Sequence, residues 1–259
     1  MYTYKILFEA LLICVLLQST AWFWQYKTKN ADIVDITWAF GIVICTLYFY
    51  FALGQFFEVS TLIFIFPGLW YLRLTIHLIV RYDVYHEDNR YAYLRKHWSK
   101  NPQIKFFLFF MFQALLIWVF SLPAFWLSHV PFEFNYKIIS ALVIGLVSLV
   151  GVTLADRQLL NFKIKNKNTK NVCDVGLWKY SRHPNYFFEW LHWFVYPILL
   201  LNSTYFCWSL IYPFLMLYFL TELTGIPFSE QQSIINRGNS YREYQNRTNK
   251  FFPWKPKVD

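Results

Sequence analysis

The run Tyr136-Lys-Ile-Ile-Ser-Ala-Leu-Val-Ile-Gly-Leu-Val-Ser-Leu-Val-Gly-Val-Thr-Leu-Ala155 decides the fold class of this chain. An apolar helix of about 20 residues is long enough to cross the ~30 Å hydrocarbon core of a bilayer. Similar apolar runs recur on both sides of it. We expect seven membrane-spanning helices, at Ile6–Trp24, Ile33–Leu53, Val59–Val80, Ile104–His129, Tyr136–Ala155, Asn185–Leu201 and Thr204–Thr224.

The composition agrees with an all-α, polytopic membrane helical bundle. Of the 259 residues 57% are hydrophobic and only 15% are charged, whereas soluble proteins carry about 25% charged residues. Bulky Trp22, Phe23 and Trp24 stand where a signal peptide needs small cleavage-site residues, so the first run is expected to remain as a span. Once the spans are removed, no soluble domain of useful size is left. Residues 1–259 are therefore expected to form a single membrane domain.

Positive charges predict the orientation of the bundle. All but three of the 24 Lys and Arg fall in loops that the seven-span count places on one side; the exceptions are Lys5, Arg73 and Lys137. Cytoplasmic loops of membrane proteins are enriched in Lys and Arg. The N-terminus is thus predicted outside and the C-terminus in the cytoplasm. This orientation explains the net charge of +9 without a nucleic-acid partner.

The spacing of the four cysteines and the absence of several common motifs exclude some kinds of site. No C-x-x-C pair is present, so we expect neither a disulfide framework nor a zinc site, and we expect no other metal. The sequence also lacks G-x-G-x-x-G, the P-loop, H-E-x-x-H and G-x-S-x-G. A nucleotide would therefore have to bind in a pocket made by helix ends.

Four polar residues stand where the sixth span begins. They lie in the stretch Gly176-Leu-Trp-Lys-Tyr-Ser-Arg-His-Pro-Asn-Tyr-Phe-Phe-Glu189. Charges are costly in a bilayer and are rarely left there without a partner or a task. Pro184 is tolerated in the first turn of a helix, whose free N–H groups favour anions. We therefore predict a phosphate or carboxylate site at Arg182, His183, Asn185 and Glu189. The structural alternative is an arginine that reaches the headgroups and an ion pair at Glu189.

Other polar residues are expected near this site. Asp156, Arg157 and Lys163 follow the fifth span, and Arg242, Tyr244 and Arg247 lie in a C-terminal segment that can fold back. Arginine binds phosphates with fork geometry and lysine as a point charge. Headgroup contacts for the lysines and an interfacial amphipathic tail are the alternatives.

The second and third spans carry a second polar group. Arg73 and His77 are four residues apart on one helix face, with Tyr71 close by, and Asp35 lies near the cytoplasmic end of the second span. Asp35 is expected to pair with Arg73 across the bundle. Alternatively, an acid, a tyrosine and a histidine here would polarise a substrate carbonyl or supply a proton.

At these residues the chain resembles bacterial membrane proteins of the steroid 5-alpha-reductase superfamily, whose C-terminal architecture is shared by isoprenylcysteine carboxyl methyltransferases and sterol C14-reductases. The resemblance covers most of the chain in order. It is carried by Trp70-Tyr-Leu-Arg-Leu74 with Arg81, Glu87–Arg95, Ala155–Lys163, Gly176–Glu189, Gly225-Ile-Pro227, Glu230, and Tyr241 through Pro253.

The resemblance implies a seven-helix bundle that binds NADPH in its cytoplasmic half. Residues 1–103 would then hold the substrate-side helices and an interfacial loop, and residues 104–259 the cofactor helices and tail. Tyr71 is the plausible counterpart of the tyrosine that grips the substrate carbonyl, and Asp35 a weaker counterpart of the acid. Two departures concern the substrate: Phe188 replaces the usual glycine before the glutamate, and the reductases' acid lies deeper than Asp35. By position, the cofactor residues are Asp156, Lys163, Tyr180, Arg182, His183, Asn185, Tyr186, Glu189, Arg242, Tyr244 and Arg247.

Three functions therefore stand as expectations. The first is an NADPH-dependent reductase of a C=C bond conjugated to a carbonyl in a steroid- or lipid-like substrate, embedded in a bacterial inner membrane with its cofactor site toward the cytoplasm. The second is a methyltransferase that uses S-adenosylmethionine on a lipid-like substrate, and the third a non-catalytic lipid-binding protein. A donor with a pyrophosphate and a 2′-phosphate needs several cations, so Arg182, Arg242, Arg247 and Lys163 favour NADPH. Membrane lipids are expected partners, and no obligate protein partner is evident.

Overall fold

The computed structural model describes residues 2–53, 64–98, 100–130, 134–167, 169–223 and 225–257, and its regular secondary structure there is entirely helical. Five helices there are long and apolar enough to cross a membrane: Thr3–Thr28, Ile33–Leu53, Pro102–Leu127, Tyr136–Lys165 and Phe206–Arg237. No strand occurs in these ranges. The prediction of an all-α, polytopic membrane protein is confirmed.

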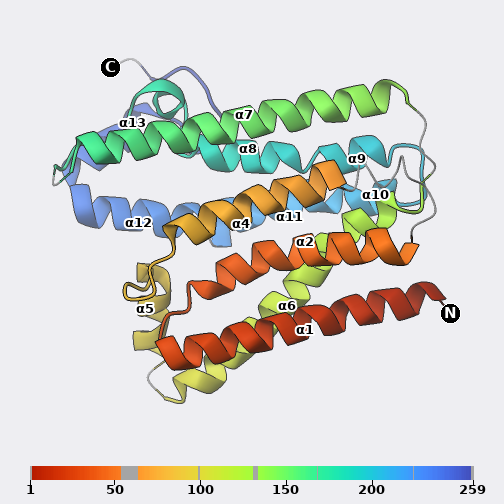
Figure 1. Cartoon of the computed structure of the whole chain (residues 1–259). Coiled ribbons are helices and arrows are strands. Elements are labelled where there is room, and N and C mark those ends of the chain that lie inside the picture. The colour runs from red at the N-terminus through yellow and green to blue at the C-terminus, as the bar shows by residue number, and fades with distance from the viewer. Residues whose placement is uncertain are drawn as a thin grey trace. The chain divides into compact units, whose positions relative to one another are not determined.

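The chain divides into two compact units, Met1–Glu133 and Phe134–Asp259. The first unit contains α1 (Tyr2–Thr28), α2 (Ile33–Leu53), η1 (Phe64–Leu69), α4 (Trp70–Arg81), α5 (Asn89–His97) and α6 (Pro102–Leu127). Helix α2 packs against α1, α4 and α6 (Figure 1). Because α6 also packs along α1, it belongs with the first unit, whereas the sequence division at residue 103 assigns it to the cofactor half.

Helix α5 docks on the first unit through an apolar cluster near the ends of α1 and α2. Tyr91 is buried there together with Ala31, Val34 and Phe106. Asp88 caps the helix by accepting a hydrogen bond from the backbone N–H of Arg90 at 2.9 Å. The cap and the buried tyrosine together position this short polar helix.

The second unit is built around α7 (Tyr136–Lys165), which packs along α8 (Pro184–His192) and α9 (Val195–Leu199). The remaining elements follow in chain order. They are η2 (Gly176–Lys179) before α8, then α10 (Phe206–Ser209), α11 (Ile211–Tyr218), η3 (Phe219–Leu223), α12 (Ile226–Arg237) and α13 (Asn239–Arg247) after α9.

Some of the seven predicted spans take a different form. The sixth, Asn185–Leu201, is divided between α8 and α9 at Trp193 and Phe194, because Pro197 has no N–H for the carbonyl of Trp193. The third span is observed as η1 and α4 from residue 64 onward, and residues 59–63 lie outside the described part. The seventh, Thr204–Thr224, is observed as α10, α11 and η3 up to Leu223, and residue 224 lies outside the described part.

A glycine lets α7 and α8 approach closely. Ser148, Gly151 and Ala155 form a small-residue face on α7, and all three are buried. A Cβ atom placed on Gly151 would lie 2.3 Å from Cδ1 of Phe188 on α8. The Phe188 ring therefore occupies the space that a side chain at position 151 would need.

Candidate functional site

The segment between α7 and α8 folds back onto the end of α7. Gly176 has φ +59°, and a Cβ atom there would meet the side chain of Gln158. Gln158 Oε1 accepts a hydrogen bond from the N–H of Leu177 at 2.9 Å, and Trp178 Nε1 donates to the carbonyl of Ala155 at 2.9 Å. These bonds set where Arg182 and His183 stand at the start of α8.

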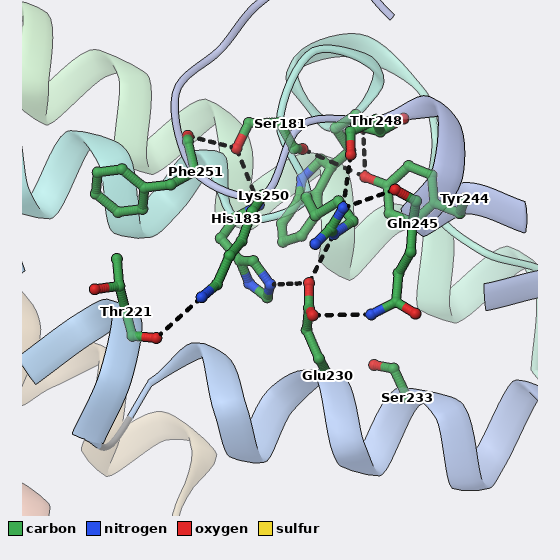
Figure 2. A network of polar contacts seen from close by, with 12 residues as sticks. Ser181, His183, Thr221, Glu230, Ser233, Tyr244, Gln245, Thr248, Lys250 and Phe251 are labelled. Atoms are coloured by element: carbon green, nitrogen blue, oxygen red, sulfur yellow. Dashed lines mark hydrogen bonds and ion pairs between the residues drawn. The ribbon is translucent and has the colours of Figure 1, made fainter. Parts of the chain in front are cut away.

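The centre of the site is Glu230 on α12, whose carboxylate points toward the start of α8 (Figure 2). Its Oε1 accepts hydrogen bonds from Arg182 Nε at 2.6 Å and from His183 Nε2 at 3.2 Å. Its Oε2 accepts one from Gln245 Nε2 on α13 at 2.8 Å. We call these four residues the Glu230 network. The carboxylate of Glu230 thus links α12 to the start of α8 and to α13.

The same arginine and its neighbours hold the C-terminal tail. Arg182 Nη1 donates to the carbonyls of Gln245 and Thr248 at 2.9 and 2.7 Å, and the Arg182 N–H donates to the carbonyl of Asn249 at 2.9 Å. Ser181 Oγ donates to the carbonyl of Phe251 at 2.8 Å (Figure 2). The tail is therefore fastened to the segment before α8 by hydrogen bonds to its main-chain carbonyls.

Burial makes the Glu230 network electrostatically strong. The side chains of Arg182 and Glu230 are only 10% and 15% exposed. Loss of solvation lowers the pKa of the buried His183 below its ordinary value, although Glu230 opposes this shift. Because a carboxylate can only accept, the His183 nitrogen that faces Glu230 carries the hydrogen. Glu230 therefore neutralises the charge of Arg182 even before any ligand binds.

Arg182 nevertheless keeps one nitrogen that the described residues do not occupy. Its Nε and Nη1 bind Glu230 and two carbonyls, whereas Nη2 makes no hydrogen bond within the described ranges. A guanidinium held by three bonds has little side-chain freedom left to lose when it binds an anion.

A second polar contact joins α7 to the first turn of α8. Asn185 Nδ2 donates to Asp156 Oδ1 at 3.2 Å, and Asn185 Oδ1 accepts from the N–H of Tyr186 at 3.0 Å. Glu189 follows four residues after Asn185 on the same helix face and is half-buried. Asp156 and Asn185, which the sequence predicts as cofactor contacts, are thus brought together from two helices, with Glu189 on the same face of α8 as Asn185.

The other predicted cofactor residues divide into exposed and internally bonded ones. Lys163, Tyr180 and Arg242 are exposed. Arg247 Nη2 is paired with Asp174 Oδ2 at 2.5 Å. Tyr244 is buried, and its hydroxyl lies 2.5 Å from the carbonyl oxygen of Trp178, so it makes a contact within the second unit.

Tyr186 stacks on the ring of His183, with centroids 5.6 Å apart and an interplanar angle of 7°. The two rings stand on adjacent turns at the start of α8. This stacking fixes the orientation of the histidine that contacts Glu230.

The expected pair between Asp35 and Arg73 in the first unit is wrong. Asp35 accepts hydrogen bonds from Arg90 Nη2 at 3.0 Å and from Tyr91 OH at 2.7 Å. It stands in the first turn of α2, where α5 docks, so the nearest donors come from α5. Asp35 therefore helps to hold α5 in place.

The three remaining predicted catalytic residues lie on α4. Tyr71 is buried and packs edge-on against Trp38, with ring centroids 5.8 Å apart. Arg73 lies over the Trp70 ring at 4.8 Å, and His77 Nε2 lies 3.4 Å from Arg81 Nη1. Tyr71 thus stands in an aromatic setting, two residues before Arg73 on α4.

Sequence reasoning missed Gln245, Arg90 and Tyr91. Arg90 and Tyr91 lie in the Glu87–Arg95 block that carries part of the resemblance, and that block could have pointed to them. Gln245 lies in a run of polar residues, and nothing in the neighbouring sequence indicates that it bonds Glu230, which lies 15 residues away.

The first unit yields a prediction about pH. Burial raises the pKa of Asp32 to about 6, with Asp88, Asp35 and Glu87 adding to it. The folded pKa exceeds the ordinary 3.8, so this contribution to stability is full below about pH 4 and is lost as pH rises through 6. Asp32→Asn should therefore gain stability relative to the parent between pH 4 and pH 7, measured as thermal unfolding midpoints in detergent.

Asp83→Asn is the matched control for Asp32→Asn. The pKa of Asp83 is lowered by hydrogen bonds from the N–H of Tyr85 and from His86. Because the stability that these bonds give is fully present above the ordinary pKa of 3.8, the midpoint curve of this exposed variant should lie slightly below that of the parent and run parallel to it between pH 4 and pH 7. Midpoint curves for Asp32→Asn and the parent that run parallel over this range would contradict the prediction.

The described fold is that of a polytopic helical membrane protein with a polar, cross-linked cluster at the start of α8. Residues 21–248 match the family described as "Protein of unknown function (DUF1295)", and the chain belongs to that family. Comparisons with curated proteins and with solved structures found no match.

Proposed function

We propose that this protein is a membrane-embedded, NADPH-dependent reductase of a C=C bond conjugated to a carbonyl in a steroid- or lipid-like substrate. The observation that carries the proposal is the contact between Asp156 and Asn185, with Glu189 four residues further along α8. These residues come from separate parts of the sequence, and they are the ones that the resemblance to steroid 5-alpha-reductases assigns to the cofactor. An amide beside a carboxylate offers both donors and acceptors to a nucleotide.

The residues around α8 fit a nucleotide with negative groups. Arg182 is held by Glu230 and two carbonyls and keeps Nη2 for an anion. The exposed Lys163 and Arg242 supply further positive charge from α7 and α13. When bound, NADPH would supply a hydride. The proposed task of the chain is to bind and orient the cofactor and to shield it from water.

Tyr71 is proposed to hold the substrate carbonyl oxygen. A tyrosine hydroxyl donates a hydrogen bond to an oxygen on which negative charge develops. Burial against Trp38 restricts the ring, so its direction is set before the substrate binds. Arg73 and His77 on the same helix are proposed to support that charge. The substrate would enter from the bilayer and the cofactor from the cytoplasm.

The test is a titration of the purified full chain in mild detergent with NADPH, followed by nicotinamide fluorescence. We expect saturable binding, and Asp156→Ala and Asn185→Ala should each weaken it by about fivefold, the effect of one lost hydrogen bond. Thr153→Ala is the matched control on α7, because its hydroxyl bonds the carbonyl of Leu149 in its own helix. Absence of saturation, or equal losses in all three variants, would reject the assignment.

One observation favours a methyltransferase as the second candidate. Arg182 and Arg247 are both engaged by carboxylates, of Glu230 and Asp174, which leaves fewer cations for phosphates than the sequence suggests. S-adenosylmethionine has no phosphate and needs fewer positive groups. A parallel titration with S-adenosylmethionine that saturates where NADPH does not would establish this alternative.

A further inference from the structure

An open hollow lies on the first unit beside the start of α6. It is lined by Trp98, Lys105, Leu108, Phe109 and Phe112. The last four stand at positions i, i+3, i+4 and i+7 of α6 and therefore share one helix face. Trp98 is the residue that ends α5. One positive side chain thus stands at one end of a wall of aromatic and aliphatic groups.

The inner wall of this hollow is held by the core of the unit. The Trp98 ring packs edge-on against Phe106 at 5.1 Å and against Phe109 at 6.2 Å. Trp98 and Phe109 both pack on the buried cluster where α5 docks. Leu108 and Phe112, by contrast, are 61% and 50% exposed. A wall that is already ordered loses little conformational freedom when a flexible chain lies on it.

The end of the hollow near Lys105 has an excess of positive charge. Lys105 is exposed, and no described carboxylate lies within ion-pair distance of it. Lys96 and Lys100 precede it and are also exposed, whereas Arg95 is neutralised by Glu87 at 2.7 Å. A ligand that balances the positive charge at this end of the hollow must be negatively charged.

We propose that this hollow, the α5–α6 groove, binds an anionic phospholipid. Its phosphate would contact Lys105, and one acyl chain would lie along Leu108, Phe109 and Phe112. Helix α6 is long and apolar enough to cross the membrane, so its first turn belongs at headgroup depth, where Trp98 also fits. From Lys105 to Phe112 the helix rises about 10 Å, which matches the upper part of an acyl chain.

The charge of the groove selects among lipids. A zwitterionic headgroup carries its own cation beside the phosphate and gains less from a lysine. Anionic lipids attract membrane-proximal lysines with an energy equivalent to about a fivefold change in affinity per residue. The site belongs to the first unit alone and does not depend on the proposed reductase activity.

Native mass spectrometry of the full chain tests the proposal. The protein is titrated in detergent with phosphatidylglycerol and with phosphatidylcholine of the same acyl chains. The parent should bind phosphatidylglycerol about fivefold more tightly, and Lys105→Gln should remove that preference. Lys165→Gln, the same change at the end of α7, should retain it. Phe112→Ser should weaken the binding of both lipids.

Three results would overturn the lipid site. The parent could bind the two lipids equally, or Lys105→Gln and Lys165→Gln could lower phosphatidylglycerol binding to the same extent, which would indicate a general charge effect. The third is displacement of phosphatidylglycerol by an equal concentration of glycerol phosphate, because that would indicate an anion site that needs no acyl chain.

Discussion

Glu230→Ala is expected to lower the free energy of unfolding by about 3–5 kcal/mol, the cost of leaving a buried charge without its partner. Arg182 is 10% exposed, and Glu230 is its carboxylate partner at 2.6 Å. The substitution also removes the acceptors of His183 and Gln245. Unfolding of the purified chain in detergent, by heat or by increasing fractions of a denaturing detergent, measures the loss.

Two further variants separate the charge from the shape of the Glu230 side chain. Glu230→Gln keeps the size and one acceptor, so its loss should be intermediate. In Arg182→Met/Glu230→Ala the loss should be smaller than the sum of the single losses, because no buried charge remains alone. Glu222→Gln is the control for a weak pair: Glu222 is 59% exposed and lies 3.5 Å from Lys250, and its replacement should change stability by less than about 1 kcal/mol. Glu230→Ala with unchanged stability would contradict the central place of this carboxylate.

Gly151→Ala is expected to be the second most damaging single change. The new methyl group would lie 2.3 Å from the Phe188 ring, so α7 and α8 would have to move apart. Overpacking of this kind costs about 1–3 kcal/mol, which exceeds the helix preference of alanine over glycine, about 1 kcal/mol. Thermal unfolding in detergent gives the measurement.

A double-mutant cycle identifies the Phe188 ring as the cause. Phe188→Ala empties the space opposite position 151, so in that background Gly151→Ala should be neutral or slightly stabilising. Equal losses from Gly151→Ala in both backgrounds would show that another contact is responsible. The cycle also concerns the site, because Phe188 directly precedes Glu189 on α8.

The apolar spans could be predicted because each depends on a local property. The second span is observed with the predicted bounds, Ile33–Leu53. The fourth overlaps α6 with a shift of two residues, and the fifth lies within α7, which continues to Lys165. In a bilayer the backbone must satisfy its own hydrogen bonds, so a long apolar run becomes a helix whatever its neighbours. The hydropathy of the sixth span does not predict the break between α8 and α9, although the sequence shows Pro197, which causes it.

The candidate site was only partly predictable. Arg182, His183 and Asn185 stand out because polar groups at the start of an apolar run are rare. Their roles depend on partners far away: Glu230 lies 48 residues from Arg182, and Asp156 lies 29 residues from Asn185. Asp35 likewise accepts hydrogen bonds from Arg90 and Tyr91 on α5 and not from Arg73.

By itself the sequence determined the class of protein, the position of most spans and the residues that open α8. Hydropathy and helix formation are decided within one or two turns, and so they can be read along the chain. Only the tertiary structure decided which charge neutralises which, and that the tail is fastened to Arg182 and Ser181. Ion pairs and side-chain contacts require residues from distant segments to meet, and packing of the helices brings them together.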